Sequence, residues 1–241
     1  SYDLQLNEAH NFFLMAGMQL EKGNRSFLTG YKTNLLVEDV PSLQTAVGDQ
    51  IISESLSQRA TTGYFSRFAY NYKSKYLLEA NARYDGSYVF RETKRWGFFP
   101  SFSVGWNVHE ESFWESVGNI VNTFKIRGSW GQLGNQNVSP FGDIELIPLQ
   151  TDKLNWIFGP GETRHVGYAT APNLVNRNLT WETATTKNIG LNLSFLSNRL
   201  QTDFDLFERI TTDMIGPSEA KPGVLGASVP RENNATLRTR G

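Results

Sequence analysis

RWGFFPSFSVGWNV, residues 95–108, alternates large apolar residues with small polar ones over a length that can cross a membrane. Successive side chains of a β-strand point to opposite faces, so this period of two predicts a strand. One face suits lipid and the other suits water. A soluble sheet would bury the same apolar face in a core, so one strand does not separate the two possibilities. The two faces carry, respectively, Phe98, Phe102, Val104, Trp106 and Val108, and Ser101, Ser103, Gly105 and Asn107.

The same alternation recurs in residues 64–72, 76–85, 123–132 and 188–207. In three of these segments the face opposite the apolar one is charged, so water must reach it. An apolar face backed by a charged face is typical of a barrel wall between lipid and an aqueous lumen. The residues predicted to line this lumen are Glu79, Arg83, Asp85, Lys125, Arg127, Asp203 and Asp205.

Weaker alternation at residues 2–6, 12–20 and 234–240 brings the total to about nine strands, an all-β antiparallel arrangement. The connections alternate between short and long, as in outer-membrane barrels with short periplasmic turns and long extracellular loops. Loops of about forty residues would be anomalous in a compact soluble domain, where about 4–6 is usual. Short connections are predicted at 7–11, 73–75, 197–198 and, with room for one helical turn, 109–119; long loops are predicted at 21–60, 86–97, 134–180 and 212–232.

Composition is compatible with a barrel and excludes other classes. The chain has 241 residues, a net charge of -1 and no basic patch, so no nucleic-acid partner is expected. It contains no cysteine and no apolar run of about 18 residues, which excludes disulfides, thiolate metal sites and a transmembrane helix. No secretory segment is present at Ser1, so we expect an exported barrel chain to start internally or after processing.

Enzyme chemistry has little support in the sequence. The three histidines, His10, His109 and His165, lack partners at metal-ligand spacing, and no phosphate-binding loop or nucleophile elbow is present. Asp203 and Asp205 share a face, as a pair of glycosidase carboxylates could, but a lumen wall predicts the same arrangement without chemistry. We therefore expect no enzymatic activity and no cofactor.

Four segments resemble consecutive barrel segments of the SusC/RagA family, the TonB-dependent outer-membrane transporters of Bacteroidetes. They are YLLEANARYDGSYVF, RWGFFPSFSVGWNVHEESFW, FKIRGSWGQLGNQN and LTWETATTKNIGLNLSFLSNRLQTDFDLFERITTDMI, and they occur in the family's order. The resemblance covers most of residues 61–240, and GMQLEKGNRSFLTGYK is similar to the preceding strand and loop. It implies a bacterial outer-membrane barrel of about 22 strands, closed by a plug and opened through TonB.

No segment resembles the plug or the TonB-binding box, so residues 1–241 are expected to be a partial barrel domain. About nine strands cannot close a barrel of about 22, and open strand edges are not tolerated in lipid. The remaining strands are therefore expected from the rest of the same barrel. Two residues depart from the pattern: Lys187 falls on an apolar face and Pro100 inside a strand, which is tolerable near a membrane rim.

The resemblance also suggests where solutes and partners bind. Aromatic side chains in the predicted loops could stack on a sugar or grip a peptide, although packing against a partner or another loop is favoured. The lumen residues could contact the passing solute, but plug contact is favoured. In this family a SusD-like lipoprotein covers the extracellular loops, so residues 134–180 and 212–232 are candidate docking surfaces. The loop aromatics are Tyr88, Trp96, Trp156, Phe158 and Tyr168.

The sequence thus predicts part of a TonB-dependent importer that takes up glycan or peptide fragments. A soluble β-sandwich carbohydrate-binding module is the main alternative, because its two sheets would pair their apolar faces. A structural barrel or adhesin without plug or lipoprotein is a third possibility. The first alternative requires the apolar faces to be buried against a second sheet, whereas the importer requires them to face outward.

Overall fold

A computed structural model describes the chain except for residues 8, 38, 40, 137, 139–144, 146, 148, 151–156, 159–163, 166–167, 171, 221, 223 and 225–228. Its main element is one antiparallel sheet of nine strands, in which each strand pairs with the next one along the chain. The strands are β1 (Tyr2–Leu6), β2 (His10–Lys32), β3 (Gln50–Tyr72), β4 (Tyr76–Ser87), β5 (Trp96–Asn107), β6 (Val121–Asn135), β11 (Glu182–Phe195), β12 (Leu200–Gly216) and β13 (Glu232–Arg240).

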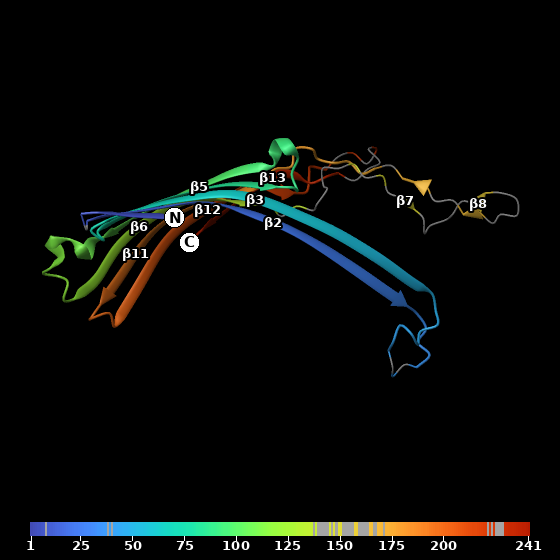
Figure 1. Cartoon of the computed structure of the whole chain (residues 1–241), viewed down its shortest axis with the longest axis horizontal. Coiled ribbons are helices and arrows are strands. Elements are labelled where there is room, and N and C mark those ends of the chain that lie inside the picture. The colour runs from blue at the N-terminus through green and yellow to red at the C-terminus, as the bar shows by residue number, and fades with distance from the viewer. Residues whose placement is uncertain are drawn as a thin grey trace.

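The sheet forms a curved single layer with short turns at one end and long connections at the other (Figure 1). Three short 3-10 helices, η1 (Glu92–Lys94), η2 (Val108–Glu110) and η3 (Ser112–Trp114), lie in the connections. Among the described residues, no helix has the length and apolar character needed to span a membrane. Two further sheets are formed by pairs of two-residue strands: β7 (Leu149–Gln150) with β10 (Tyr168–Ala169), and β8 (Ile157–Phe158) with β9 (Arg164–His165).

The strand register confirms the predicted face assignment. Phe102 pairs with Ala80 on one side and Trp130 on the other, whereas Ser103 pairs with Glu79 and Ser129. Because the register is continuous, the apolar residues of neighbouring strands share one face, which we call the outward face. Val104 is 56% exposed there. One assignment was wrong: Val108 leaves the strand, begins η2 and is buried, because the strand ends at Asn107.

The exposed outward face contradicts the β-sandwich alternative. In a sandwich, residues such as Phe102 and Leu206 would pack against a second sheet. Here Phe102 is 54% exposed and Leu206 is 73% exposed. The two small sheets have two-residue strands, too short to cover a nine-stranded layer. The apolar side of the sheet is therefore available to lipid.

Aromatic side chains form two belts on the outward face, one at each end of the strands. Tyr76 stacks with Tyr72 and Trp106 near the short turns, at centroid distances of 6.2 and 6.4 Å. Near the long loops, Trp96 stacks with Tyr84 at 4.8 Å and Tyr64 at 6.1 Å. These two groups of rings match the paired aromatic girdles of membrane barrels.

The spacing of the belts fits a bilayer. Tyr76 and Tyr84 lie eight residues apart on β4, which is about 27 Å at about 3.4 Å per residue. A strand tilt of about 40° reduces this to about 20 Å along the membrane normal, close to the roughly 25 Å apolar band of such barrels. The height of the outward face between the belts is therefore similar to that of the apolar band of a membrane barrel.

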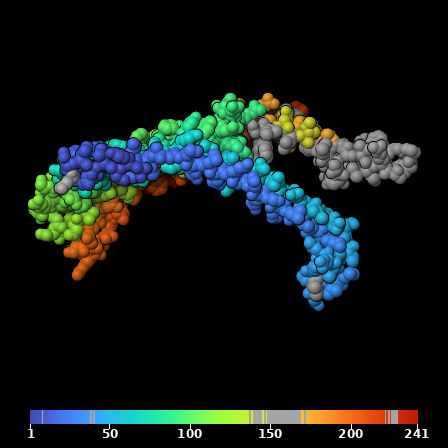
Figure 2. All heavy atoms as spheres, in the orientation of Figure 1, coloured from blue at the N-terminus to red at the C-terminus, as the bar shows by residue number. Residues whose placement is uncertain are grey.

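Strands β2 and β3 are much longer than predicted. The sequence predicted a loop over 21–60, but the ladder continues to the pair Lys32 and Gln50, so the connection is only residues 33–49. This ribbon projects past the rest of the sheet (Figure 2). Beyond the Tyr64 belt it carries polar and apolar residues on both faces, because both faces lie outside the lipid. Polar residues at outward register positions, such as Lys22, Asn24 and Gln58, therefore hid the period of two.

The short turns lie where they were predicted. Lys73 and Ser74 adopt left-handed backbone conformations, with φ of 49° and 57°, which lets β3 reverse directly into β4. The Asn71 side chain accepts a hydrogen bond from the Ser74 backbone N–H at 2.8 Å. The connection at 109–119 contains part of η2 and all of η3, so it is more helical than a simple turn.

Candidate functional site: the polar face of the sheet

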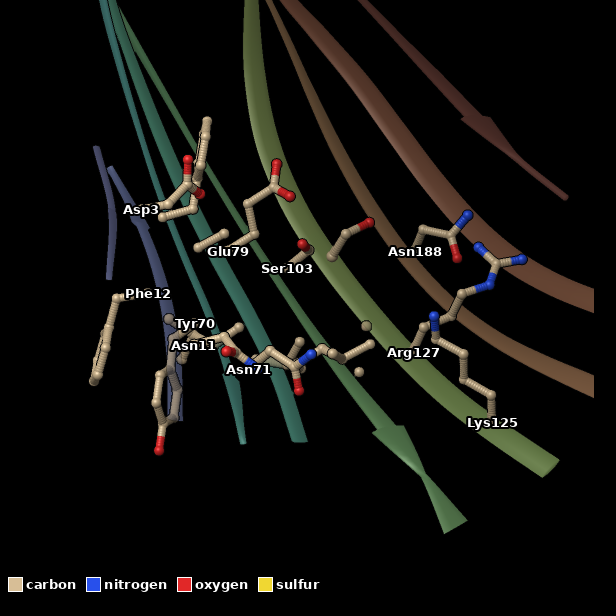
Figure 3. A pocket seen from close by; sticks show the side chains of 18 residues that line it. Asp3, Asn11, Phe12, Tyr70, Asn71, Glu79, Ser103, Lys125, Arg127 and Asn188 are labelled. Atoms are coloured by element: carbon tan, nitrogen blue, oxygen red, sulfur yellow. The ribbon is translucent and has the colours of Figure 1, made fainter. Parts of the chain in front are cut away.

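An open cavity of about 490 Å³ extends across several strands, lined by polar-face side chains and by a few outward residues such as Val104. Side chains from β4, β5, β6 and β11 line it side by side (Figure 3). Its polar lining includes Glu79, Ser103, Lys125, Arg127 and Asn188. The seven residues predicted to line the lumen all lie on this face by register. They alternate in sign across the sheet, so the wall can bind both cationic and anionic groups.

Arg127 and Asp205 form an ion pair that reaches across an intervening strand. The Arg127 Nη2 atom lies 2.6 Å from Asp205 Oδ2, and Gly190 of β11 lies between the two residues in register. A Cβ atom on Gly190 would come within 2.6 Å of Arg127 Cζ. A larger residue at this position would displace the two charged groups, because the missing side chain of glycine leaves the space in which they meet.

The pair belongs to a larger polar network. Arg127 Nε donates to Asn192 Oδ1 at 3.1 Å, and the Asn192 amide donates in turn to Asp203. Lys125 is the register partner of Asn192 on β6. Within the described part of the chain it forms no ion pair. Asn192 was not singled out from the sequence. Its position two residues from Gly190 on the same face was the available signal.

A second group of charged residues lies on β3 and β4. Glu79 accepts from Arg67 Nη2 at 2.7 Å and from the Asn81 amide at 2.9 Å. Arg83 and Asp85 pair at 3.0 Å along the same strand. These pairs are partly exposed, and such pairs contribute at most about 1 kcal/mol each to stability. Their main consequence is a hydrated, charged surface.

Cysteine labelling tests the face assignment directly. We expect Arg83→Cys to react with a membrane-impermeant, water-soluble thiol reagent in intact barrels, because Arg83 lies on the polar face. Ala82→Cys should stay unmodified, because its side chain points to lipid. Residues 1–241 contain no cysteine, so mass spectrometry of peptides from this region assigns the label to the introduced site. Labelling of Ala82→Cys in preference to Arg83→Cys would mean that the strand is one residue out of step.

Four buried residues form a small apolar core at the loop end, which we call the loop-end cluster: Phe90, Phe99, Leu179 and Trp181. The Trp181 ring lies 5.2 Å from that of Phe90 and 5.4 Å from that of Phe99, and its Nε1 atom donates to the Arg95 carbonyl at 3.0 Å. Phe99 lies on the polar face of β5, where it interrupts the alternation. The cluster joins residues 88–95 to the segment that enters β11.

Hydrogen bonds extend this loop-end structure to the neighbouring strands. The buried Glu182 accepts from the Ile215 backbone N–H at 2.8 Å and from the Asn135 amide at 2.7 Å. Asn233 bonds both backbone groups of Thr180, at 3.1 and 3.0 Å. Because each partner comes from a different strand or loop, these contacts connect β6, β11, β12 and β13 at one level.

The predicted loop aromatics lie in different environments. Tyr88 is in the turn after β4, where its backbone N–H donates to the Ala60 carbonyl at 3.2 Å. Trp96 is the first residue of β5 and belongs to the outward aromatic belt, not to a loop. Phe158 and Tyr168 lie in β8 and β10. Their side chains, and the whole of Trp156, lie outside the described part of the structure.

At the opposite end, Glu111 connects the 3-10 segment to the aromatic belt. Its carboxylate accepts from Lys75 Nζ at 2.9 Å, Tyr76 Oη at 2.8 Å and Trp106 Nε1 at 3.2 Å. The Lys75 hydrogen bond, followed by that of Tyr76, lowers the pKa of Glu111 below its usual value. The same contact raises the pKa of Lys75. Both residues lie outside the strands.

We expect the contribution of Glu111 to stability to depend on pH. Because its pKa is lowered in the folded state, the contribution is present above its ordinary pKa of 4.5 and is lost as pH falls through the folded value. Glu111→Gln should therefore lower the melting temperature at neutral pH, with a difference from wild type that shrinks in acid. The raised pKa of Lys75 adds stability that is present below 10.5 and is lost at higher pH. An equal difference at neutral and acid pH would contradict the assignment.

Comparison with known proteins identifies the family. All of residues 1–241 match the family model described as TonB dependent receptor-like, beta-barrel. The chain is 33% identical to the TonB-dependent receptor SusC of Bacteroides thetaiotaomicron, over 77% of this chain and 18% of SusC. It is 29% identical to the TonB-dependent receptor P3 of Formosa agariphila, over 97% of this chain and 23% of P3. The chain thus spans less than a quarter of the length of these relatives.

A solved structure shows the same fold. The RagAB peptide importer in its closed-closed state matches with a TM-score of 0.84 and 19% identity, over 99% of this chain and 25% of the importer chain. The match covers the nine-stranded sheet, which is therefore an unclosed part of a larger barrel. Family model, relatives and fold agree, and the chain belongs to the TonB-dependent receptor family, as a β-barrel segment of the SusC/RagA type in the bacterial outer membrane.

Proposed function

We propose that the complete protein imports glycan or peptide fragments across the outer membrane, using energy delivered through TonB. The observation that carries this proposal is the contrast between the two faces of one sheet. The outward face has aromatic belts spaced for a bilayer, and the other face carries hydrated ion pairs such as Arg127 and Asp205. A wall of this kind separates lipid from an aqueous path wide enough for polar solutes.

The charged face would contact a plug domain at rest and the passing solute during transport. We assign these contacts to the seven lumen residues Glu79, Arg83, Asp85, Lys125, Arg127, Asp203 and Asp205. We place the plug, the TonB-binding segment and the remaining strands outside residues 1–241, which would form one partial barrel domain. Mixed charge suits this role, because a plug held by partly exposed ion pairs can be released without breaking a large apolar interface.

The loop end would hold a SusD-like surface lipoprotein that captures substrate. The projecting β2–β3 ribbon supports this, because it carries exposed apolar residues beyond the lipid, such as Leu28 at 71% and Ile52 at 68%. Residues 212–232 are a second candidate contact. About half of the other candidate, 134–180, lies outside the described residues. Tyr88, Trp156, Phe158 and Tyr168 are candidates for packing against this partner or for stacking on captured substrate, whereas Trp96 would contact lipid.

We propose transport without catalysis. The two carboxylates that could suggest glycoside hydrolysis are both engaged: Asp205 pairs with Arg127, and Asp203 accepts from Asn192. A general acid needs a raised pKa, usually through an apolar surrounding or a neighbouring negative charge. These residues have a guanidinium and an amide as hydrogen-bonding neighbours, which is not the surrounding of a general acid.

Uptake by whole cells tests this function. In a strain that lacks the full-length gene, we expect loss of uptake of fluorescent oligosaccharides or peptides, restored by the complete protein. A protonophore should abolish the restored uptake, because TonB action depends on the proton gradient. Comparing the two labelled substrate classes decides between glycan and peptide. Unchanged uptake of both classes after deletion would contradict import, and co-purification without plug or lipoprotein would favour the adhesin.

A further inference from the structure

The outward face contains one group of charged residues among its apolar side chains. Glu208 of β12 accepts hydrogen bonds on Oε1 from two arginines of β13, Arg238 and Arg240, with both Nε atoms at 2.8 Å. Lys187 of β11 is the register partner of Glu208 on its other side. We call these four residues the outward basic cluster. Their register positions, shared with Leu206 and Ile189, place them on the face that meets lipid.

The cluster lies at the level of the loop-end aromatic belt. Tyr84 is ten residues from Ser74 in its short turn, and Glu208 is also ten residues from its own turn at Asn198. Lys187 precedes Ser197 of the same turn by ten residues. Because the short turns mark one side of the membrane, equal distances along the strands give equal heights. The cluster is therefore at the extracellular edge of the hydrocarbon layer, where lipid headgroups begin.

The cluster carries an excess of positive charge. Three cations and one carboxylate leave a net charge of +2, and Lys187 has no ion pair within the described part of the chain. The carboxylate is the more buried partner, with a side chain 23% exposed, against 52% for Arg238 and 65% for Arg240. Glu208 thus lies beneath the two guanidinium groups and orients them, while the cations face outward.

A purely structural ion pair needs one arginine for one carboxylate. Because Arg238 and Arg240 share the single carboxylate of Glu208, one of their positive charges and that of Lys187 are uncompensated within the cluster. At this level uncompensated charge is unfavourable unless headgroups supply the counter-charge. Among the described residues, Arg240 contacts Glu208 through Nε, which leaves its two Nη groups available as donors. Planar guanidinium donors match the oxygens of a phosphate group in a way that a lysine ammonium does not.

We propose that the outward basic cluster binds the phosphate group of a phosphorylated lipid in the outer leaflet. Arg238 and Arg240 would donate to the phosphate oxygens, Lys187 would add a third positive charge, and Glu208 would hold the arginines in position. The adjacent apolar residues Leu206 and Ile189, 73% and 65% exposed, would contact the acyl chains of the same lipid. This site faces away from the lumen and is independent of the transported substrate.

The test uses the complete transporter in nanodiscs of phosphatidylcholine, with or without added lipid A as the phosphorylated glycolipid. Native mass spectrometry would measure the lipid A retained. We expect Arg238→Ala together with Arg240→Ala to reduce retention by more than tenfold, at about five-fold for each cation removed near a membrane surface. Glu208→Gln should not weaken lipid A retention by changing the charge of the site, because it removes the carboxylate that competes with the phosphate for the arginines.

Arg209→Ala is the matched control, because Arg209 follows Glu208 on β12 but lies on the polar face. It should retain lipid A as wild type does. If the double alanine variant fails to fold, two milder variants replace it. Lys187→Gln should reduce lipid A retention by the loss of one charge. Arg238→Lys with Arg240→Lys should reduce it by the loss of guanidinium geometry at constant charge. Equal retention by wild type and the folded double variant would overturn the proposal. Full displacement by inorganic phosphate would also overturn it, by assigning the site to a free anion.

Discussion

Replacing Ala80 with arginine is expected to lower the free energy of unfolding of the complete barrel by about 2–4 kcal/mol. Ala80 lies midway between Tyr76 and Tyr84, the two belt residues of β4, and points outward beside Phe102. An arginine there would place a charge near the bilayer midplane, where snorkelling to either headgroup region is hardest. Denaturant unfolding in lipid vesicles, followed by tryptophan fluorescence, measures the loss.

Ser103→Arg is the control for this change, because Ser103 is adjacent in register but lines the polar cavity. Its new charge would meet water and the carboxylate of Glu79, so we expect a much smaller loss. Val104→Arg should give an intermediate value, because Val104 lies closer to the Trp106 belt and the penalty falls to about 0–1 kcal/mol near the interface. Similar losses for Ala80→Arg and Ser103→Arg would refute the outward face.

The second large effect is expected from Trp181→Ala, which removes the central ring of the loop-end cluster. Trp181 is 8% exposed and contacts Phe90 and Phe99. Truncation of a buried aromatic residue costs about 3–5 kcal/mol. The effect should be local, so hydrogen exchange should rise in residues 88–95 and 172–182 and stay unchanged in β3 and β4.

Trp181→Phe separates packing from hydrogen bonding in the same position. It keeps most of the apolar volume but loses the Nε1 bond to the Arg95 carbonyl. We expect a loss of roughly 1 kcal/mol, the usual net value of one hydrogen bond, in addition to a small packing term. Trp96→Ala provides an outward-facing comparison and should leave exchange in residues 172–182 unchanged. Unaltered exchange in Trp181→Ala would mean that the cluster does not hold the loops.

The sequence predicted the membrane-crossing part of the sheet well, because two solvents act on it. Lipid on one face and water on the other impose a period of two, which residues 95–108 and 76–85 display. The same rule places Arg127 and Asp205 on the polar face from the sequence alone, without reference to their contact. It also marked Lys187 as an exception, and the register now puts Lys187 at the edge of the hydrocarbon layer.

Where only one solvent acts, the prediction failed. The ribbon beyond Tyr64 has water on both faces. Backbone hydrogen bonds hold its two strands together, and these bonds do not require side chains to alternate. The loop-end cluster was missed for another reason. Trp181 and Arg95 are 86 residues apart in sequence, and the sequence around each of them does not predict their contact. Phe99, a large apolar residue on a polar face, was the one local sign.

The loop-end cluster has a mechanical consequence. Side chains from residues 88–95, β5 and the start of β11 are joined there, and Glu182 extends the connection to β6 and β12. Strands that are joined at their ends in this way cannot separate from one another independently. We therefore expect this part of the barrel rim to move as one rigid unit. If the complete protein is the importer proposed above, movement at this arc would come from parts seated against the rim, while the tips of β5, β6, β11 and β12 keep their spacing.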